Sequence, residues 1–246
     1  LSGIGDSSGL GAVGITTKKH LPGVGKNLQD HLQARPIFKT DLSTINTETS
    51  NYFKQAIIGL QYVLRKTGPM TMAASLGAGF LKTESWQETP DIQFHIQPFS
   101  ADNAIEGPHP FSAFTASVLQ LRPESVGHLK LVSANIDDHP EIHPNYLEAE
   151  IDQRTIVKGI QIARKIAQFE PLKSHIIEEY QPGLGVAMDD YDATLNWARN
   201  TAVTIYHPTG TCKMGSDPMA VVDHRLRVHG LRGLRVADAS IMPVIT

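Results

Sequence analysis

The stretch Ile92-Gln93-Phe94-His95-Ile96-Gln97 alternates strictly between apolar and polar side chains. In an extended chain the apolar residues lie on one face, and the polar residues, including His95, lie on the other. This period of two predicts a strand with one buried face. Residues 114–121 and 128–133 also have strand character, and the loop between them contains Pro123 and Gly127. We expect these two segments to pair antiparallel.

Helices are predicted before and after these strands in the sequence. Helical spacing of apolar residues predicts them over residues 53–65, 151–169 and 191–200. In the second helix Arg164 lies off the apolar stripe, and Pro171 prevents the helix from continuing. Asp189 or Asp190 can cap the N-terminus of the third helix. With a last strand expected at 233–237 and an irregular, Gly-rich region over 1–35, the pattern predicts a mixed α+β fold around an antiparallel sheet.

Composition excludes several classes of function. Lys+Arg 22 against Asp+Glu 25 gives the 246 residues a net charge of −3, too close to neutral for non-specific nucleic-acid binding. The single cysteine, Cys212, excludes an internal disulfide framework and a cysteine-cluster zinc site. No apolar run approaches the roughly 20 residues of a membrane-spanning helix. We therefore expect no nucleic-acid partner and no membrane span.

Three motifs have ordinary interpretations. His139 and His143 have the spacing of metal ligands on a helix, but a proline follows each of them, so we expect surface histidines in turns and no metal site. Residues 3–9 have the spacing GxGxxxG without a visible strand before them, which favours a loop over a dinucleotide-binding turn. Cys212 near His207 could form a thiol nucleophile with its base, although a single cysteine is more often a small buried hydrophobe.

The most informative stretch is Tyr206-His207-Pro208-Thr209-Gly210-Thr211-Cys212-Lys213-Met214-Gly215. Pro208 holds His207 in an extended conformation, so a loop and not a helix presents the imidazole. A lone histidine is usually structural, because hydrogen bonds can satisfy any buried imidazole. Its context decides between that role and a chemical one.

Three stretches together resemble the glucose–methanol–choline (GMC) family of flavin-dependent oxidoreductases. They are Ser2–Gly5 followed by Leu21–His31, then Tyr206–Gly215, then Val221–Pro243. Their order and separations agree with the family, and the resemblance covers essentially the whole chain. It implies an antiparallel-sheet substrate domain with helices, over residues 36–200. Incomplete remnants of an FAD-binding α/β domain would lie at 1–35, which would cover the flavin, and at 201–246, which would hold the catalytic loop.

The resemblance also implies roles for individual residues. His207 matches the histidine that takes the hydroxyl proton of an alcohol while hydride leaves for flavin N5, and a neutral imidazole can accept that proton. His95 aligns with a histidine that helps bind the alcohol oxygen in choline-oxidising relatives, although a solvent-facing histidine on an exposed sheet surface explains its position equally well. For cofactor binding, the matching positions are Asn27, Asp30 and His31, against the flavin, and Asp238 and Ala239, in a late FAD-contacting turn.

The sequence departs from the family in three places. The amino-terminal βαβ unit with its GxGxxG turn is absent, so we expect this chain alone to bind FAD poorly and to be inactive. The residue that pairs with the catalytic histidine, an Asn or His, would follow Thr246. Leu76 occupies the place of a glutamate that, in choline-specific members, can neutralise the quaternary ammonium, which favours an uncharged primary alcohol as the small-molecule substrate.

Competing functions remain open at this point. The leading prediction is a fragment of an FAD-dependent alcohol (choline-like) dehydrogenase or oxidase, with either oxygen or a quinone as electron acceptor. A catalytically silent binding module that keeps the substrate-domain fold is the alternative, and a hydrolase that uses Cys212 is a third possibility. We expect a cytoplasmic location.

Overall fold

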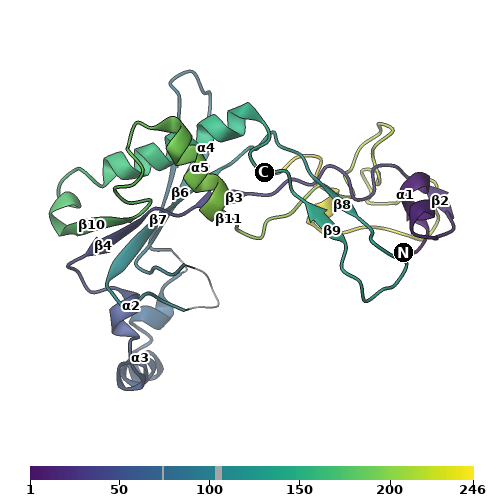
Figure 1. Cartoon of the computed structure of the whole chain (residues 1–246). Helices are drawn as coiled ribbons and strands as arrows, with labels where there is room; N and C mark the ends of the chain where they lie inside the picture. The colour runs from purple at the N-terminus through teal and green to yellow at the C-terminus, as the bar shows by residue number, and fades with distance from the viewer. Residues whose placement is uncertain (74, 103–106) are drawn as a thin grey trace. The chain divides into compact units, whose positions relative to one another are not determined.

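The computed structural model describes residues 1–73, 75–102 and 107–246 (Figure 1). In chain order the helices and strands are β1 (Ile4–Gly5), α1 (Ser7–Ala12), β2 (Lys19–His20), β3 (Leu32–Ala34), β4 (Ile37–Thr40), α2 (Ile45–Glu48), α3 (Tyr52–Arg65), η1 (Pro69–Thr71), β5 (Gly77–Leu81), β6 (Ile92–Gln97), β7 (Ala113–Gln120), β8 (His128–Lys130), β9 (Glu141–His143), α4 (Glu150–Ile166), η2 (Lys173–His175), β10 (Ile176–Gln181), α5 (Tyr191–Thr201), β11 (Val203–Thr204) and η3 (Ala239–Ile241). The mixed α+β class predicted from the sequence is confirmed.

The seven-stranded sheet is built around β7. One edge of β7 pairs antiparallel with both β4 and β3, and the other edge pairs antiparallel with β6 along its whole length. β6 in turn pairs antiparallel with β5. The strand predicted at 92–97 therefore lies inside the sheet, where the register places His95 opposite Ala78 on one side and Ser117 on the other.

The predicted pairing of residues 114–121 with 128–133 is wrong. β8 pairs with β9 in a separate two-stranded sheet, and β7 pairs with β6. The connecting loop is held elsewhere, because the backbones of Leu28 and Gly127 exchange hydrogen bonds of 3.0 and 2.8 Å. The Asp152 carboxylate also accepts hydrogen bonds from the backbone N–H groups of Glu124 and Ser125. These contacts, all within the first part of the chain and residues 121–152, hold the loop before β8 begins.

Helix α4 covers the apolar face of the sheet, as Figure 1 shows. Ile156 and Ile160 are fully buried, which confirms the stripe predicted for this helix. Gly159 allows the close approach, since a β-carbon there would lie 2.6 Å from Val118 Cγ2. Val118 is paired with Phe94, so α4 packs on the Phe94 face and His95 projects from the opposite face.

Arg164 is a correction to the sequence analysis, which placed it off the buried stripe of α4. Only 5% of its side chain is exposed, and Nε lies 2.7 Å from Glu179 Oε1. The guanidinium also donates to Glu179 Oε2 and to the carbonyl of Val186. A buried Arg–Glu pair, which helical periodicity does not reveal, thus joins α4 to β10.

The two other predicted helices are also confirmed. α5 begins after Asp190, whose carboxylate accepts a hydrogen bond of 2.9 Å from the N–H of Ala193. α3 ends at Arg65, and the next residue, Lys66, adopts the left-handed conformation with φ of 54°. None of the α3 residues is buried.

The chain divides into two compact units. The first comprises residues 1–32, 121–152 and 204–246, and the second comprises residues 33–120 and 153–203. The core of the first unit is a cluster of Leu21, Val221, Val222 and Val228. The division of the complete protein at residues 35 and 200 stays a prediction, and the grouping of 121–152 with both ends of the chain had no sequence signal.

Two further local predictions need correction. Residues 1–35, expected to be irregular, contain the parallel pair β1–β2, helix α1 and strand β3. Residues 233–237, expected to form a strand, make only an isolated bridge between Arg227 and Arg235. The strands in these regions are three residues or shorter, too short for a period of two to be diagnostic.

Candidate active site

The predicted base His207 lies in an exposed loop of the first unit, directly after β11. Tyr206 before it has a positive φ of 65°, and Pro208 follows. The loop returns to Gln29, whose backbone exchanges hydrogen bonds of 3.1 and 2.8 Å with Thr209. The imidazole is therefore presented at the tip of a loop whose two ends are fixed, and it is open to a reacting molecule.

Asp30 holds the backbone of this loop by a hydrogen bond. Its carboxylate is only 8% exposed and accepts a hydrogen bond of 2.9 Å from the backbone N–H of His207. The hydroxyls of Tyr146 and Thr204 donate to the other carboxylate oxygen. Burial, followed by the hydrogen bond to Asp30, raises the pKa of Tyr146 well above its ordinary value, so this phenol stays a donor. One buried carboxylate thus joins three segments of the chain.

His31 contacts the ring of His207 directly. The two Nδ1 atoms are 3.1 Å apart, and the ring centroids are 5.4 Å apart at an interplanar angle of 72°. His31 Nε2 lies 2.9 Å from the carbonyl oxygen of Leu121. Burial lowers the pKa of His31, and the nearby ring of His207 adds to that effect. Its neutral form is therefore favoured.

These contacts determine which nitrogen atoms carry protons. The carbonyl of Leu121 can only accept, so Nε2 of His31 must be the protonated nitrogen. The Nδ1 atom of a neutral His31 then has a lone pair and accepts from Nδ1–H of His207. A neutral His207 that donates from Nδ1 has a free lone pair on Nε2, as a general base requires.

Asn27 fixes the other end of the same loop. Its side-chain amide donates to the carbonyls of Pro243, at 3.1 Å, and Gly210, at 3.4 Å. Gly210 has a φ of 90°, and a β-carbon there would lie 2.2 Å from the Asn27 carbonyl oxygen. No larger residue fits at this contact without a backbone shift.

Asp238 and Ala239 lie beside the residues that follow Gly210. The carbonyls of Ala239 and Ser240 accept hydrogen bonds from the N–H groups of Gly210 and Cys212, at 3.4 and 2.8 Å. Asp238 caps η3 by accepting from the N–H of Ser240, and hydrogen bonds from Ser240 lower the pKa of its carboxyl. Both Asp238 and Ala239 are exposed.

His95 and Leu76 belong to the second unit. The backbone N–H of Leu76 donates to the carbonyl of Ile96, which is one residue out of step with the β5–β6 register, where Gly77 pairs with Ile96. Leu76 lies in a bend directly before β5, and 65% of its side chain is exposed. His95 projects from the face of the sheet that is turned away from α4.

Cys212 packs against the core of the first unit, next to Val221 and Val222. Burial raises the pKa of its thiol, which disfavours the thiolate that nucleophilic chemistry needs. The described residues hold no group of three or more His, Cys, Asp or Glu side chains placed to bind an ion. His143 lies in strand β9, not in a turn, and stacks on His128 with centroids 4.7 Å apart.

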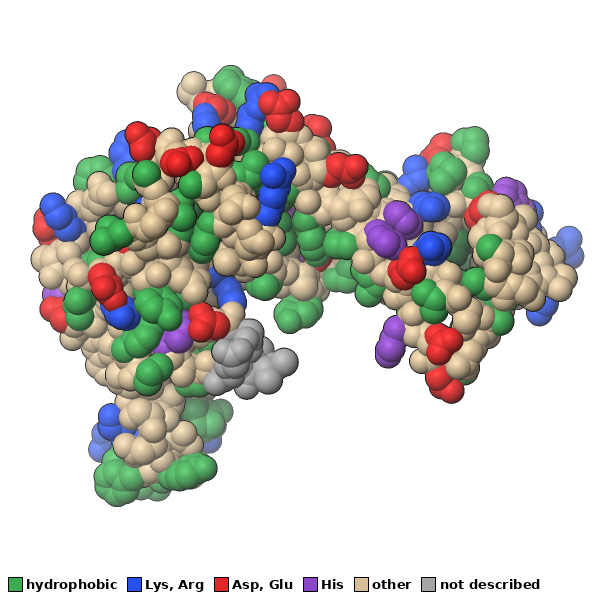
Figure 2. Space-filling model, viewed as in Figure 1, with side chains coloured by type: hydrophobic (Ala, Val, Ile, Leu, Met, Phe, Trp, Pro, Cys, Tyr) green, Lys and Arg blue, Asp and Glu red, His purple; other side chains and the backbone are tan. Residues whose placement is uncertain are grey.

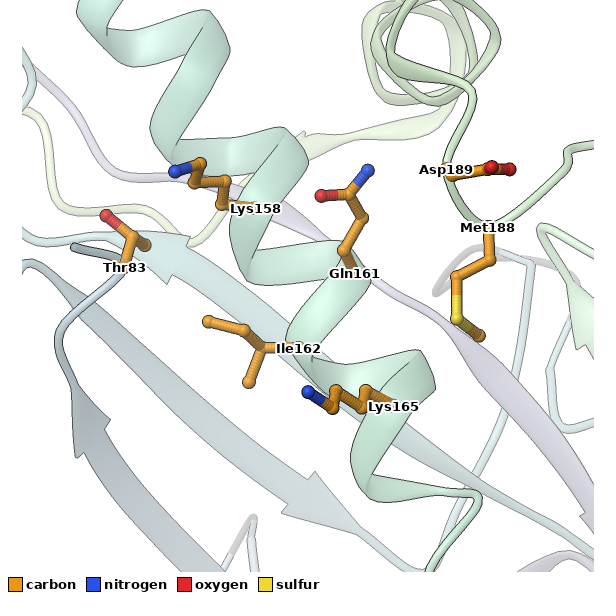
Figure 3. A pocket seen from close by; sticks show the side chains of 7 residues that line it. All are labelled: Thr83, Lys158, Gln161, Ile162, Lys165, Met188 and Asp189. Atoms are coloured by element: carbon orange, nitrogen blue, oxygen red, sulfur yellow. The ribbon is translucent and has the colours of Figure 1, made fainter.

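A cavity of about 380 Å³ lies elsewhere, along α4 (Figure 3). Lys158, Gln161 and Lys165 of α4 line it together with Met188 from the loop before α5. None of the predicted site residues borders it, and Lys158 is already paired with Glu84. We assign this cavity no role.

In the described part of the chain, no helix has both the length and the apolar character to cross a membrane.

Sequence reasoning missed Tyr146 and Thr204, and it did not foresee that His31 contacts His207. Tyr146 is 116 residues from Asp30, and His31 is 176 residues from His207. The usable sequence signal was the acid Asp30 next to His31, and it does not show which residues either of them contacts.

The chain has clear relatives among known proteins. The family model of GMC oxidoreductases matches residues 123–246. The alcohol dehydrogenase (acceptor) of Pseudomonas putida is 38% identical over 244 residues, which are 99% of this chain and 44% of that protein. The mitochondrial choline dehydrogenase of Homo sapiens is 40% identical over 253 residues, covering 99% of this chain and 41% of that protein. The chain therefore spans less than half the length of these relatives.

Solved structures have the same fold. Pyridoxine 4-oxidase from Mesorbium loti matches with a TM-score of 0.80 and 26% identity, covering 99% of this chain and 44% of that one. Formate oxidase from Aspergillus oryzae matches with a TM-score of 0.89 and 23% identity, covering 99% of this chain and 47% of that one. The second likeness concerns the fold alone.

Proposed function

Because this chain belongs to the GMC oxidoreductase family, we propose that it carries the catalytic base and the alcohol-binding sheet of an FAD-dependent oxidoreductase. The proposed reaction converts a primary alcohol to an aldehyde. The hydroxyl proton goes to Nε2 of His207. The hydride leaves the carbon that bears this hydroxyl and would go to the flavin of the complete protein. The observation that carries this proposal is the exposed imidazole of His207, whose Nδ1 is engaged by His31 and whose backbone is held by Asp30.

The residues around His207 fit the flavin ring system. Tyr206 is 81% exposed and Val244 is 63% exposed, so the loop and the segment that Asn27 ties to it present open apolar surface. Asp238 and Ala239 add exposed polar and backbone groups next to the loop. A bound flavin would supply the hydride acceptor. We expect FAD binding to need the part of the family proteins that this chain does not span.

Within this site the residues of the chain have separate tasks. His207 takes the proton, and His31 keeps the lone pair of His207 on Nε2. Once His207 is protonated, Nδ1 of His31 accepts a charge-assisted hydrogen bond from the imidazolium, which is stronger than a neutral one. Asp30, with Tyr146 and Thr204 as its donors, keeps the loop from moving during the transfer.

The substrate proposal rests on the second unit. His95 projects from the face of the sheet turned away from α4, where a histidine can hold an alcohol oxygen. Leu76 lies in the bend directly before β5, and a leucine cannot pair with a cation. We propose that uncharged primary alcohols are oxidised with higher kcat/KM than choline. Steady-state kinetics of the complete protein with both substrates test this, and faster oxidation of choline would contradict it.

The experiment for the whole proposal is His207→Ala in the complete, flavin-loaded protein. We expect bound FAD, seen as the visible flavin absorbance, to be unchanged, and flavin reduction in anaerobic stopped-flow to slow by about 100-fold or more, the typical contribution of a general base. His139→Ala is the matched control, since His139 is also exposed and precedes a proline. Equal reduction rates in the two variants would remove His207 from the mechanism.

The same measurements separate the alternatives. A silent binding module would purify without flavin colour and would not be reduced by any alcohol. A Cys212 hydrolase would be inactivated by thiol alkylation, whereas we expect alkylation of this partly buried thiol with a raised pKa to be slow and alcohol oxidation to survive it.

A further inference from the structure

Helix α3 turns its apolar side outward. With about 100° of rotation per residue, six large apolar residues fall within one arc of about 140°. They are Tyr52, Phe53, Ile57, Leu60, Val63 and Leu64, here named the apolar α3 face, and their exposed fractions run from 51% for Ile57 to 89% for Tyr52. The partly buried residues Ile58 and Tyr62 lie on the opposite side of the helix. A helix that packs on its own core has the reverse arrangement.

The position of α3 in the second unit leaves this face open. In Figure 1, α3 lies beyond α2, on the side of the large sheet away from α4 and α5. Figure 2 shows apolar side chains gathered at the tip that α3 forms, with basic side chains close to them. Met70 in η1, directly after the helix, is 57% exposed and extends the apolar surface.

The charges of this segment have one sign. Between Glu48 and Glu84 the sequence has no acidic residue, whereas it has four basic ones, Lys54, Arg65, Lys66 and Lys82, in a chain whose net charge is −3. Among the residues that the structure describes, none of these four cations has an acidic partner within ion-pair distance. Lys54 donates to the carbonyl of Thr47 and to Ser50, both neutral groups, and Lys66 lies over the Tyr62 ring. The positive charge is therefore uncompensated.

We propose that α3 docks on an anionic lipid bilayer, with its axis in the plane of the interface and the apolar α3 face in the headgroup and acyl boundary. An interfacial helix of this kind combines a wide apolar face with lysines and arginines that reach anionic headgroups. At 14 residues α3 is too short to span the roughly 20 residues of a hydrocarbon core. The uncompensated positive charge favours an anionic membrane over a second copy of this chain. If two copies packed α3 against α3, the like charges of the two helices would meet.

The test uses the complete protein and flotation with two kinds of vesicle, one of phosphatidylcholine alone and one of equal parts phosphatidylcholine and phosphatidylglycerol. We expect binding to the anionic vesicles, weakened by salt. Replacing Phe53, Leu60 and Leu64 by serine should weaken it by at least about 100-fold, since each buried apolar side chain contributes on the order of tenfold. The control is Ile136→Ser with Leu184→Ser, which changes two exposed apolar residues outside α3 and should bind as the parent does.

A second pair of variants tests the charges. Arg65→Gln with Lys66→Gln should weaken binding to the anionic vesicles by about fivefold per removed cation. The control Lys173→Gln with Arg232→Gln removes two exposed cations elsewhere and should have little effect. Thermal melting of every variant should match the parent, because the substituted side chains are exposed.

Four results would overturn the proposal. One is equal binding of the α3 variants and their controls, and a second is no binding by the parent protein. Another is protection of the Phe53, Leu60 and Leu64 side chains from hydroxyl-radical labelling in the complete protein without vesicles, which would show that another part of the chain covers α3. The last is a dimer that the serine variants convert to a monomer, which would assign the face to a second copy. His207→Ala should bind vesicles normally, so this proposal stands apart from the proposed function.

Discussion

Replacing His31 by phenylalanine tests the proton arrangement of the site. The substitution removes the acceptor of the Nδ1–H bond from His207 and the donor to the Leu121 carbonyl, while it keeps a ring in the same buried place. His31→Asn is the matched variant, because its side-chain oxygen can occupy the position of Nδ1 and still accept.

The size of the effect follows from two hydrogen bonds. A bond between neutral groups contributes about 1 kcal/mol, so its loss changes the ratio of the two His207 tautomers by about fivefold. A bond to the imidazolium contributes about 1.5–3 kcal/mol. Because the His207 ring is exposed and water can replace part of the bond, we take the lower end. The rate of flavin reduction should fall about tenfold in His31→Phe and by less in His31→Asn.

Two measurements check this expectation in the complete, flavin-loaded protein. Anaerobic stopped-flow gives the rate of flavin reduction. Imidazole ¹⁵N chemical shifts give the protonated nitrogen of His207, a readout that a purely structural role of His31 would not move. We expect the proton on Nδ1 in the parent and in His31→Asn, and a mixture of tautomers in His31→Phe.

The reasoning would be refuted by a parent protein whose His207 carries its proton on Nε2. It would also be refuted if His31→Phe reduced the flavin at the parent rate with an unchanged tautomer. Thermal melting of both variants serves as the control for folding, so a slow but unfolded variant would not be counted as support.

Three other predictions follow from the same structure. Burial is the main cause that lowers the pKa of His31 from its ordinary 6.5, so the unfolded chain takes up this proton at a higher pH than the folded chain does. The free energy of unfolding should therefore decline below about pH 6.5. Denaturant titrations should show a smaller decline in His31→Asn. Arg164→Leu should lower the free energy of unfolding by about 3 kcal/mol, because it leaves Glu179 without its partner, and adding Glu179→Leu should restore much of the loss in the same assay. Leu76→Glu should raise kcat/KM for choline relative to a neutral alcohol by about tenfold, as expected for one carboxylate near a cation; an unchanged ratio in steady-state kinetics would show that Leu76 lies away from the substrate.

Local patterns were sufficient for some of the regular elements. The alternation at 92–97 identified β6 and its polar face, and the apolar stripe at 151–169 identified α4. Both signals arise because the side-chain period of an element is a property of its own backbone. The residues of the family motifs likewise indicated the family, which the family model and the relatives confirm.

Contacts between distant segments could not be read in this way. The pairing of β7 with β6, and not with β8, depends on where Leu28 holds the intervening loop. The burial of Arg164 depends on Glu179 arriving from another strand. A residue's own sequence neighbourhood contains no record of either partner.

The chemical character of the residues was thus determined by the sequence alone: a histidine in a loop before proline, a leucine in place of an acid, and an amphipathic α3. Only the tertiary structure decided what each of them faces. It brought His31 within 3.1 Å of His207 across 176 residues and turned the apolar side of α3 outward. The physical reason is that periodicity records which side of an element is apolar, whereas packing decides what, if anything, covers that side.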